Sequence, residues 1–97
     1  MEQAHLFNAA GAIVRNNLSA NVKAVAVEWS GENAELKLLY YFDVAPTEDD
    51  LELQELSMCE LIAEFSDIRT SKCHASVQPF IEERSQPAVN IVYVRRA

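Results

Sequence analysis

The sequence predicts an α+β fold, a two-layer sandwich in which an antiparallel sheet of about four strands carries two helices on one face. Two segments, residues 2–18 and the stretch after Thr47, repeat apolar residues at helical spacing. Four other segments alternate apolar and polar residues or concentrate β-branched and aromatic ones. The order along the chain is α-β-β-α-β-β. Because 97 residues suit one domain, we assign residues 1–97 to a single domain.

The first helix is predicted over residues 2–18. Its apolar residues recur every three or four positions and define one buried face, formed by Leu6, Phe7, Ala10, Ile13, Val14 and Leu18. Gly11 lies inside this helix, where glycine costs about 1 kcal/mol relative to alanine. We therefore expect this turn of the helix to pack closely against another element.

Residues 22–29 and 34–43 are predicted to form a hairpin. A two-residue type II′ turn at Gly31 and Glu32 would set the register of the two strands. This register pairs Val27 with Leu36, Val25 with Leu38, and Glu28 with Glu35. One face of the hairpin is then nearly all apolar, so the helices should cover it.

The second helix begins in the most acidic stretch, residues 43–67, which holds nine of the fifteen acidic residues and no Lys or Arg. Thr47 is the expected N-cap, and Asp50 completes a capping box. We expect an apolar stripe to face the core, formed by Leu51, Met58, Ile62 and Phe65 and widened by Leu56, Cys59 and Ala63. The opposite face carries Glu52, Glu60 and Glu64, with Glu55 nearer the edge.

Two further strands are predicted after this helix. Residues 68–77 alternate weakly and should be the less buried strand, whereas Val89–Val94 reads VNIVYV and is strongly typical of a strand. Residues 80–88 are expected to form a loop with a short turn of helix. The sequence leaves open whether the last two strands pair with each other or flank the hairpin.

The net charge of −7 argues against nucleic acid or an anionic membrane as partner, since both require clusters of Lys and Arg. The N-terminus lacks the basic lead of a signal peptide, and no apolar run is long enough to span a bilayer. The two cysteines show no metal or redox spacing. We expect a cytoplasmic protein with reduced thiols.

Few residues suit catalysis. Cys73 and His74 are neighbours on a predicted strand, so their side chains should lie on opposite faces and cannot act as a nucleophile and base. The acidic residues near Asp43 lack the ligand spacing of a calcium loop, and no glycine-rich phosphate loop occurs. We expect no catalytic residue, no metal and no cofactor, and a binding surface instead of an active site.

Away from the turn, the second face of the hairpin becomes apolar and lies beside the acidic helix start. An exposed aromatic side chain next to charge is typical of partner-binding surfaces. The predicted partner-binding residues are Leu39, Tyr41, Asp43, Glu48, Asp49, Asp50 and Glu52. The alternatives are an ordinary solvated face, a homodimer joined through the free sheet face, and a small enzyme.

Two runs, LLYYFDVAPTEDDLELQELSMCELIAEF and the closing VYVRR, resemble small bacterial immunity proteins of contact-dependent growth inhibition and related toxin systems. The similarity covers residues 22–65 and 92–96. It implies a cytoplasmic antidote that binds a cognate toxin domain and blocks it without doing chemistry. The acidic surface of the chain fits a basic toxin domain of the nuclease type. Residues 69–87 match no part of this pattern and are the rival location for toxin recognition.

Overall fold

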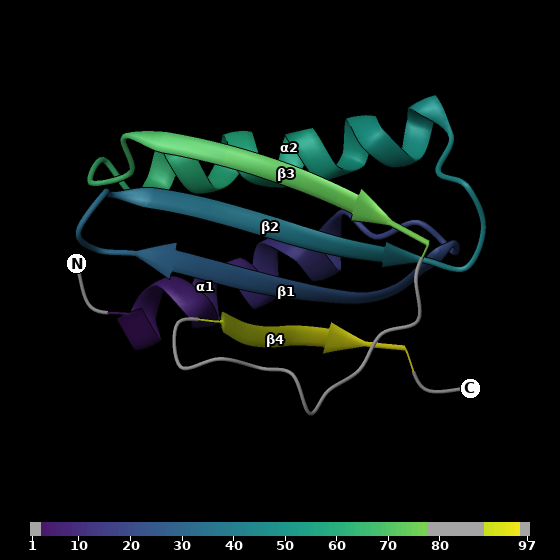
Figure 1. The fold of residues 1–97 in the computed structure, drawn as a ribbon, viewed down its shortest axis with the longest axis horizontal. Helices are drawn as coiled ribbons and strands as arrows, with labels where there is room; N and C mark the ends of the chain where they lie inside the picture. Colours follow the sequence, from purple (N-terminus) through teal and green to yellow (C-terminus); the bar gives the residue numbers. More distant parts are fainter. Residues whose placement is uncertain (1–2, 78–88, 96–97) are drawn as a thin grey trace.

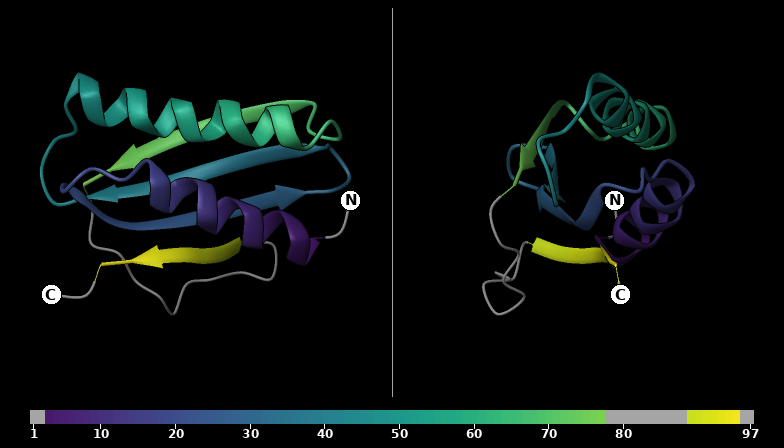
Figure 2. Two further views of the ribbon diagram at one scale, coloured as in Figure 1. Left: turned by 180° about the vertical axis from the view of Figure 1, so that it is seen from behind. Right: turned by 90° about the vertical axis from the view of Figure 1, so that its right-hand side faces the viewer.

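The computed structural model of the protein describes residues 3–77 and 89–95. The elements are α1 (Gln3–Asn16), β1 (Val22–Ser30), β2 (Glu35–Phe42), α2 (Glu48–Glu64), β3 (Thr70–Ser76) and β4 (Val89–Val94). Both helices cover the same face of a four-stranded sheet (Figures 1 and 2). The predicted two-layer α+β architecture and the element order are confirmed. The short helical turn expected within residues 80–88 falls outside the described residues.

The strands lie in the order β3-β2-β1-β4, so the last two strands flank the hairpin. Strand β1 is antiparallel to both of its neighbours, but β3 runs parallel to β2. The sheet is therefore mixed. The prediction that it would be antiparallel throughout was wrong. The reason is the crossover through α2, whose 17 residues span about 25 Å and return the chain to the start of β2.

The hairpin turn differs from the prediction. Its strands are joined by four residues, 31–34, and not by a two-residue turn. The left-handed backbone occurs at Ala34, with φ of 52°, and not at Gly31. The Ala34 carbonyl accepts hydrogen bonds from the N–H groups of Arg69 (2.8 Å) and Thr70 (3.2 Å). These two bonds tie the turn to the start of β3.

The longer turn shifts the register by two residues, so Val27 faces Leu38. Because side chains alternate with a period of two, the predicted apolar face still points to the helices. The shift also places Glu28 opposite Lys37 instead of opposite another glutamate. An unfavourable pair of like charges is thereby replaced by a complementary one.

The first helix packs as predicted. Leu6, Ala10 and Val14 are buried in the core, and the other residues of the predicted face pack against it. Gly11 is also buried, and a methyl group built on it would lie 3.8 Å from the Cβ of Val92 in β4. The expectation that this turn packs closely is confirmed.

The second helix is capped as predicted but rotated about its axis. The capping box between Thr47 and Asp50 is present in both directions. The predicted core stripe is wrong in part, because Leu51, Leu56 and Ile62 are 40, 46 and 39% exposed and Cys59 is exposed. The buried face instead consists of Asp50, Gln54, Ser57, Met58 and Leu61.

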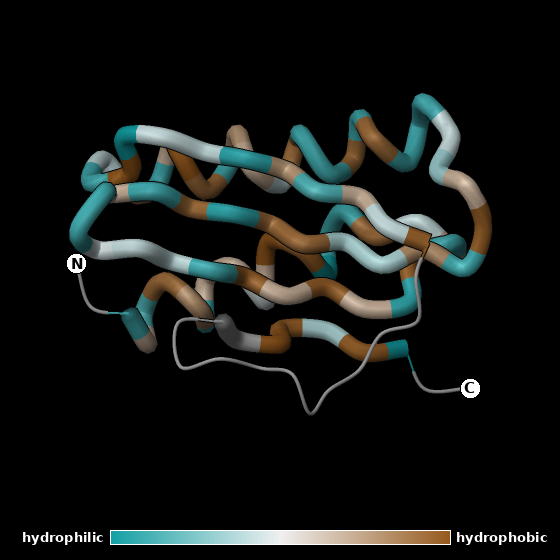
Figure 3. The backbone as a smooth tube through the Cα atoms, viewed as in Figure 1, coloured by the Kyte–Doolittle hydropathy of each residue, from teal (hydrophilic) through white to brown (hydrophobic). Residues whose placement is uncertain are grey.

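Polar contacts explain this rotation. The Gln54 amide nitrogen donates to the carbonyl oxygens of His74 (3.0 Å) and Leu38 (3.5 Å), which lie on adjacent strands. Ser57 is fully buried near Tyr40, and burial raises the pKa of the Tyr40 hydroxyl to about 12, with Ser57 opposing the shift. The two hydroxyls do not form a hydrogen bond of normal geometry. Apolar and polar residues alternate along α2 (Figure 3), and three of the apolar ones, Leu51, Leu56 and Ile62, are exposed.

Candidate partner-binding surface

The outer face of α2 is an exposed anionic surface. The helix holds seven acidic residues and no basic one, and Glu48, Asp49 and Glu52 are exposed. No Lys or Arg in residues 3–77 and 89–95 forms an ion pair with these three carboxylates. We call Glu48, Asp49 and Glu52 the acidic face. Its charge is available to a partner.

Asp50 differs from its neighbours because it serves the fold. It is only 4% exposed. Its carboxylate accepts hydrogen bonds from the Thr47 backbone N–H (2.9 Å) and from the Asn21 side chain (3.1 Å). These bonds, the Thr47 one foremost, lower the pKa of Asp50 to about 2. The structure thus separates Asp50 from the acidic face, although the two adjoin in sequence.

Asp43 is paired within the protein. Its carboxylate forms an ion pair and hydrogen bond with the Arg95 guanidinium, which also donates to the Ala20 carbonyl oxygen at 2.9 Å. The Arg95 backbone N–H donates to the Lys23 carbonyl oxygen at 2.8 Å, next to the end of β4. The negative charge of Asp43 is therefore compensated by a residue of the same chain.

Leu39 and Tyr41 lie on the sheet face opposite the helices. They alternate along β2 with buried residues that point into the core, and both are only half-buried. Their cross-strand neighbours on β1 are the small residues Ala26 and Ala24. Because α2 covers the other side of the sheet (Figure 2), the structure does not place Leu39 and Tyr41 on one surface with the acidic face. Sequence adjacency had suggested that it would.

Sequence reasoning missed a groove between α2 and the edge strand β3. Its volume is about 390 Å³, and its lining residues are Glu55, Met58, Cys59, Ile62, Ser71 and Cys73. The stripe that had been assigned to the core supplies one wall. The sequence did contain a signal that the predicted stripe was not the buried face. Leu61 is apolar but lies outside that stripe, and the helix cannot bury both Leu61 and the whole stripe.

The two cysteines line this groove. Cys73 is exposed at the edge of the sheet, but partial burial of its thiol raises the pKa to about 11, with the nearby charges of Glu55 and Cys59 adding to the effect. A raised pKa keeps the thiol protonated and weakly nucleophilic at neutral pH. Cys73 therefore contributes a neutral, weakly nucleophilic side chain to the groove.

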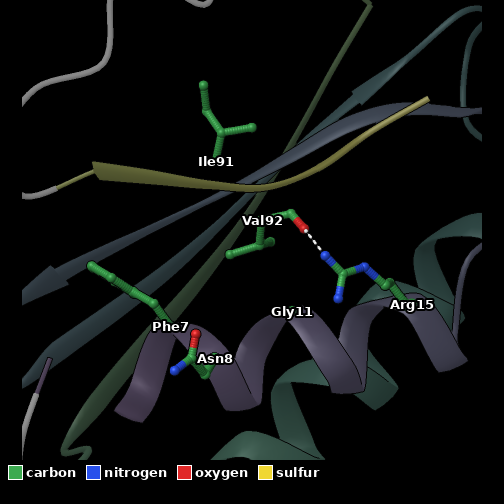
Figure 4. Close-up of a pocket in the computed structure, with 6 residues that line it drawn as sticks. All are labelled: Phe7, Asn8, Gly11, Arg15, Ile91 and Val92. Carbon is green, nitrogen blue, oxygen red and sulfur yellow. Dashed lines mark hydrogen bonds between the residues drawn. The ribbon is translucent and has the colours of Figure 1, made fainter. Parts of the chain in front are cut away.

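A smaller hollow of about 150 Å³ lies between α1 and β4. Figure 4 shows Val92 directed toward α1 and Ile91 directed away from it. The Arg15 guanidinium donates a hydrogen bond of 3.2 Å to the Val92 carbonyl oxygen and so ties the helix to the strand. This hydrogen bond and the packing of Gly11 against Val92 hold α1 against β4, so we assign the hollow a structural role.

Within the described part of the chain, no group of three or more His, Cys, Asp or Glu side chains is arranged to hold a metal ion. No helix there is long and apolar enough to cross a membrane. The fold and its surface thus define a small α+β protein that offers an acidic helix and an adjoining groove lined by both apolar and polar side chains. Those features are suited to binding another protein.

The sequence profile of the MafI2 immunity protein family matches residues 5–97, and the chain belongs to this family. The match covers almost the whole chain and confirms the resemblance to small bacterial toxin-immunity proteins. No curated protein matches the sequence. Family membership gives the chain the role of an immunity protein, whose partner is a toxin protein.

Proposed function

We propose that this protein is a cytoplasmic bacterial antidote to a toxin delivered by contact-dependent growth inhibition or a related system. It binds the toxin domain and blocks it without catalysing a reaction. Membership of the MafI2 immunity protein family over residues 5–97 is the observation that carries this proposal. The unpaired acidic face adds a physical reason for the choice of partner.

The proposed partner is a basic toxin domain, of the kind that acts on nucleic acid. A surface that holds RNA or DNA is positively charged, and the net charge of −7 on this chain is complementary to it. Long-range attraction raises the association rate above the unsteered range of about 10⁵–10⁶ M⁻¹s⁻¹. The same charge repels nucleic acid itself.

Glu48, Asp49 and Glu52 are the proposed contact residues, since their carboxylates are exposed and unpaired in the described structure. Asp50 caps the helix and Asp43 is paired with Arg95, so we do not include these two residues in the proposed contact. Leu39 and Tyr41 remain candidate anchors only for a toxin that also covers the opposite sheet face.

Growth rescue tests the proposal. A candidate toxin domain, sought among the products of neighbouring genes, is expressed from an inducible promoter in bacterial cells, with and without this protein. We expect loss of viability without it, restored growth with it, and a stable complex between the two purified proteins. No rescue and no complex would reject the proposal. A D49K/E52K variant at equal expression should protect less well.

The sheet face that carries Leu39 and Tyr41 supports one alternative, a homodimer joined through that face. Sedimentation of the purified protein at micromolar concentration separates the two ideas. A monomer leaves that face open to a toxin, whereas a stable dimer that buries Tyr41 removes it as an anchor.

A further inference from the structure

We propose that the groove between α2 and β3 receives an extended segment of the toxin domain, which adds to the sheet as a new strand along β3. This assignment rests on the proposed function for the identity of the partner. It adds the mode of contact, strand addition, and the apolar anchor that the acidic face by itself does not provide.

The first support is the outer edge of β3. Among the described strands, β3 is one of the two at the edges of the sheet, and Thr70 to Ala75 are all exposed. Every second residue of an edge strand directs its N–H and C=O away from its one neighbour. The strand contains no proline, and its seven residues extend about 23 Å. An edge of this kind is a template for main-chain hydrogen bonding by a partner.

The second support is the groove beside that edge. Helix α2 runs alongside β3 in the opposite direction (Figures 1 and 2), so its stripe follows the strand. Met58 is buried at the base of the groove, and Ile62 and Cys59 are exposed on its wall. Leu51, which is 40% exposed, continues this apolar stripe toward the N-terminal end of α2. Side chains from one face of an added strand would cover these apolar groups.

Charge determines which kind of strand fits. Glu55 lines the groove, so a basic residue among the apolar ones of the incoming segment is favoured. On the other face of β3, Lys72 and His74 are exposed, and Lys72 lies 3.5 Å from Glu35. That side suits polar residues. The expected segment therefore alternates polar residues with apolar and basic ones.

A second copy of this chain is a poorer occupant. Pairing two β3 edges would place two α2 helices side by side on the same face of the joined sheet. Each of these helices carries seven acidic residues and no basic one. Like charges at such a boundary oppose association, whereas a basic toxin domain meets the same helix with complementary charge.

Two matched substitutions on α2 test the assignment. Ile62 lines the groove, whereas Leu56 is similarly exposed but does not line it. Both become serine, which changes no charge, and affinity for the candidate toxin domain of the growth-rescue test, carrying an inactivating substitution, is measured by calorimetry. We expect I62S to weaken binding at least tenfold and L56S to change it less than threefold. Thermal melts check that both variants fold.

Hydrogen exchange on the unmodified protein provides a second readout. Upon complex formation, alternate backbone amides of residues 71–75 should become protected as they pair with the added strand. Absence of this protection, or equal losses of affinity in I62S and L56S, would overturn strand addition while leaving the immunity role intact. Failure of the unmodified protein to bind the toxin domain would instead reject the proposed function and this assignment with it.

Discussion

The side-chain amide of Gln54 donates a hydrogen bond of 3.0 Å to the backbone carbonyl oxygen of His74, joining the buried side of α2 to the edge strand β3. The same nitrogen lies 3.5 Å from the Leu38 carbonyl oxygen on the adjacent strand. Gln54 is 2% exposed, so this polar contact is made inside the protein. It fixes the rotation of α2 and leaves Leu51 and Ile62 facing outward.

Replacing Gln54 with alanine should destabilise the protein by about 2 kcal/mol. The change removes a buried donor and leaves a cavity between α2 and the sheet. Urea unfolding measures the difference, and Glu52→Ala on the exposed side of the same helix should stay within about 0.5 kcal/mol. A Gln54→Ala variant as stable as the Glu52→Ala control would show that the contact does not position the helix.

Asp50 should make stability depend on acidity. Its pKa is lowered from 3.8 to about 2 in the folded protein, first by the Thr47 N–H and then by side chains including Asn21. The unfolded chain therefore binds the proton more readily between these values. The stabilisation is complete above about pH 4 and is lost as the pH falls toward 2.

Melting temperatures at pH 5, 4, 3 and 2 measure this dependence. An Asp50→Asn variant, which cannot titrate at this position, should show a flatter decline across the window. Asp49→Asn, on the exposed neighbour, should keep the slope of the unmodified protein. Identical slopes in the Asp50 and Asp49 variants would contradict the assigned role.

Gly11→Ala should stabilise the protein by up to about 1 kcal/mol. Alanine favours the helix interior over glycine by that amount. The added methyl group would meet Arg15 at 3.7 Å and Val92 at 3.8 Å, which are ordinary contact distances. Calorimetric melting should show a higher midpoint. A lowered midpoint would mean that α1 and β4 need the glycine for a closer approach.

Cys73 should react slowly with alkylating reagents. Its pKa is raised to about 11, chiefly by burial, so little thiolate exists at pH 8. In a Cys59→Ser variant, iodoacetamide should modify folded Cys73 at least about tenfold more slowly than the urea-unfolded chain. The gap should narrow as the pH is raised to 10. Equal rates at pH 8 would show that the pKa of Cys73 is not raised in the folded protein.

The sequence was sufficient for the architecture and for the helix cap. Apolar periodicity located both helices and the hairpin face, and Thr47 with Asp50 marked the start of α2. It was insufficient for the rotation of α2, since that depends on Gln54 reaching carbonyl groups of β2 and β3, strands remote in sequence. The parallel pairing of β3 likewise depends on tertiary contacts. The crossover helix returns the chain to the start of β2, where the Ala34 carbonyl accepts hydrogen bonds from Arg69 and Thr70, and no local pattern predicts those bonds.

The candidate site was predictable only in its charge. The acidic face was visible in the sequence as a run of carboxylates. The pairing of Asp43 with Arg95 was not, because 51 residues separate the two in the chain. Leu39 and Tyr41 adjoin the acidic run in sequence, yet strand alternation sends them to the opposite side of the sheet. The groove at β3 needed the tertiary structure, because its two walls come from different elements.

The association rate of the toxin domain with this protein tests the central claim most directly. Stopped-flow mixing at low and high salt compares the unmodified protein with D49K/E52K. The matched variant E32K/E64K carries the same charge change at the other end of the molecule. We predict an association at least tenfold slower for D49K/E52K at low salt, a smaller gap at high salt, and a lesser effect of E32K/E64K. Equal rates for the unmodified protein and D49K/E52K at low salt would contradict an immunity protein that captures its toxin through the acidic face of α2.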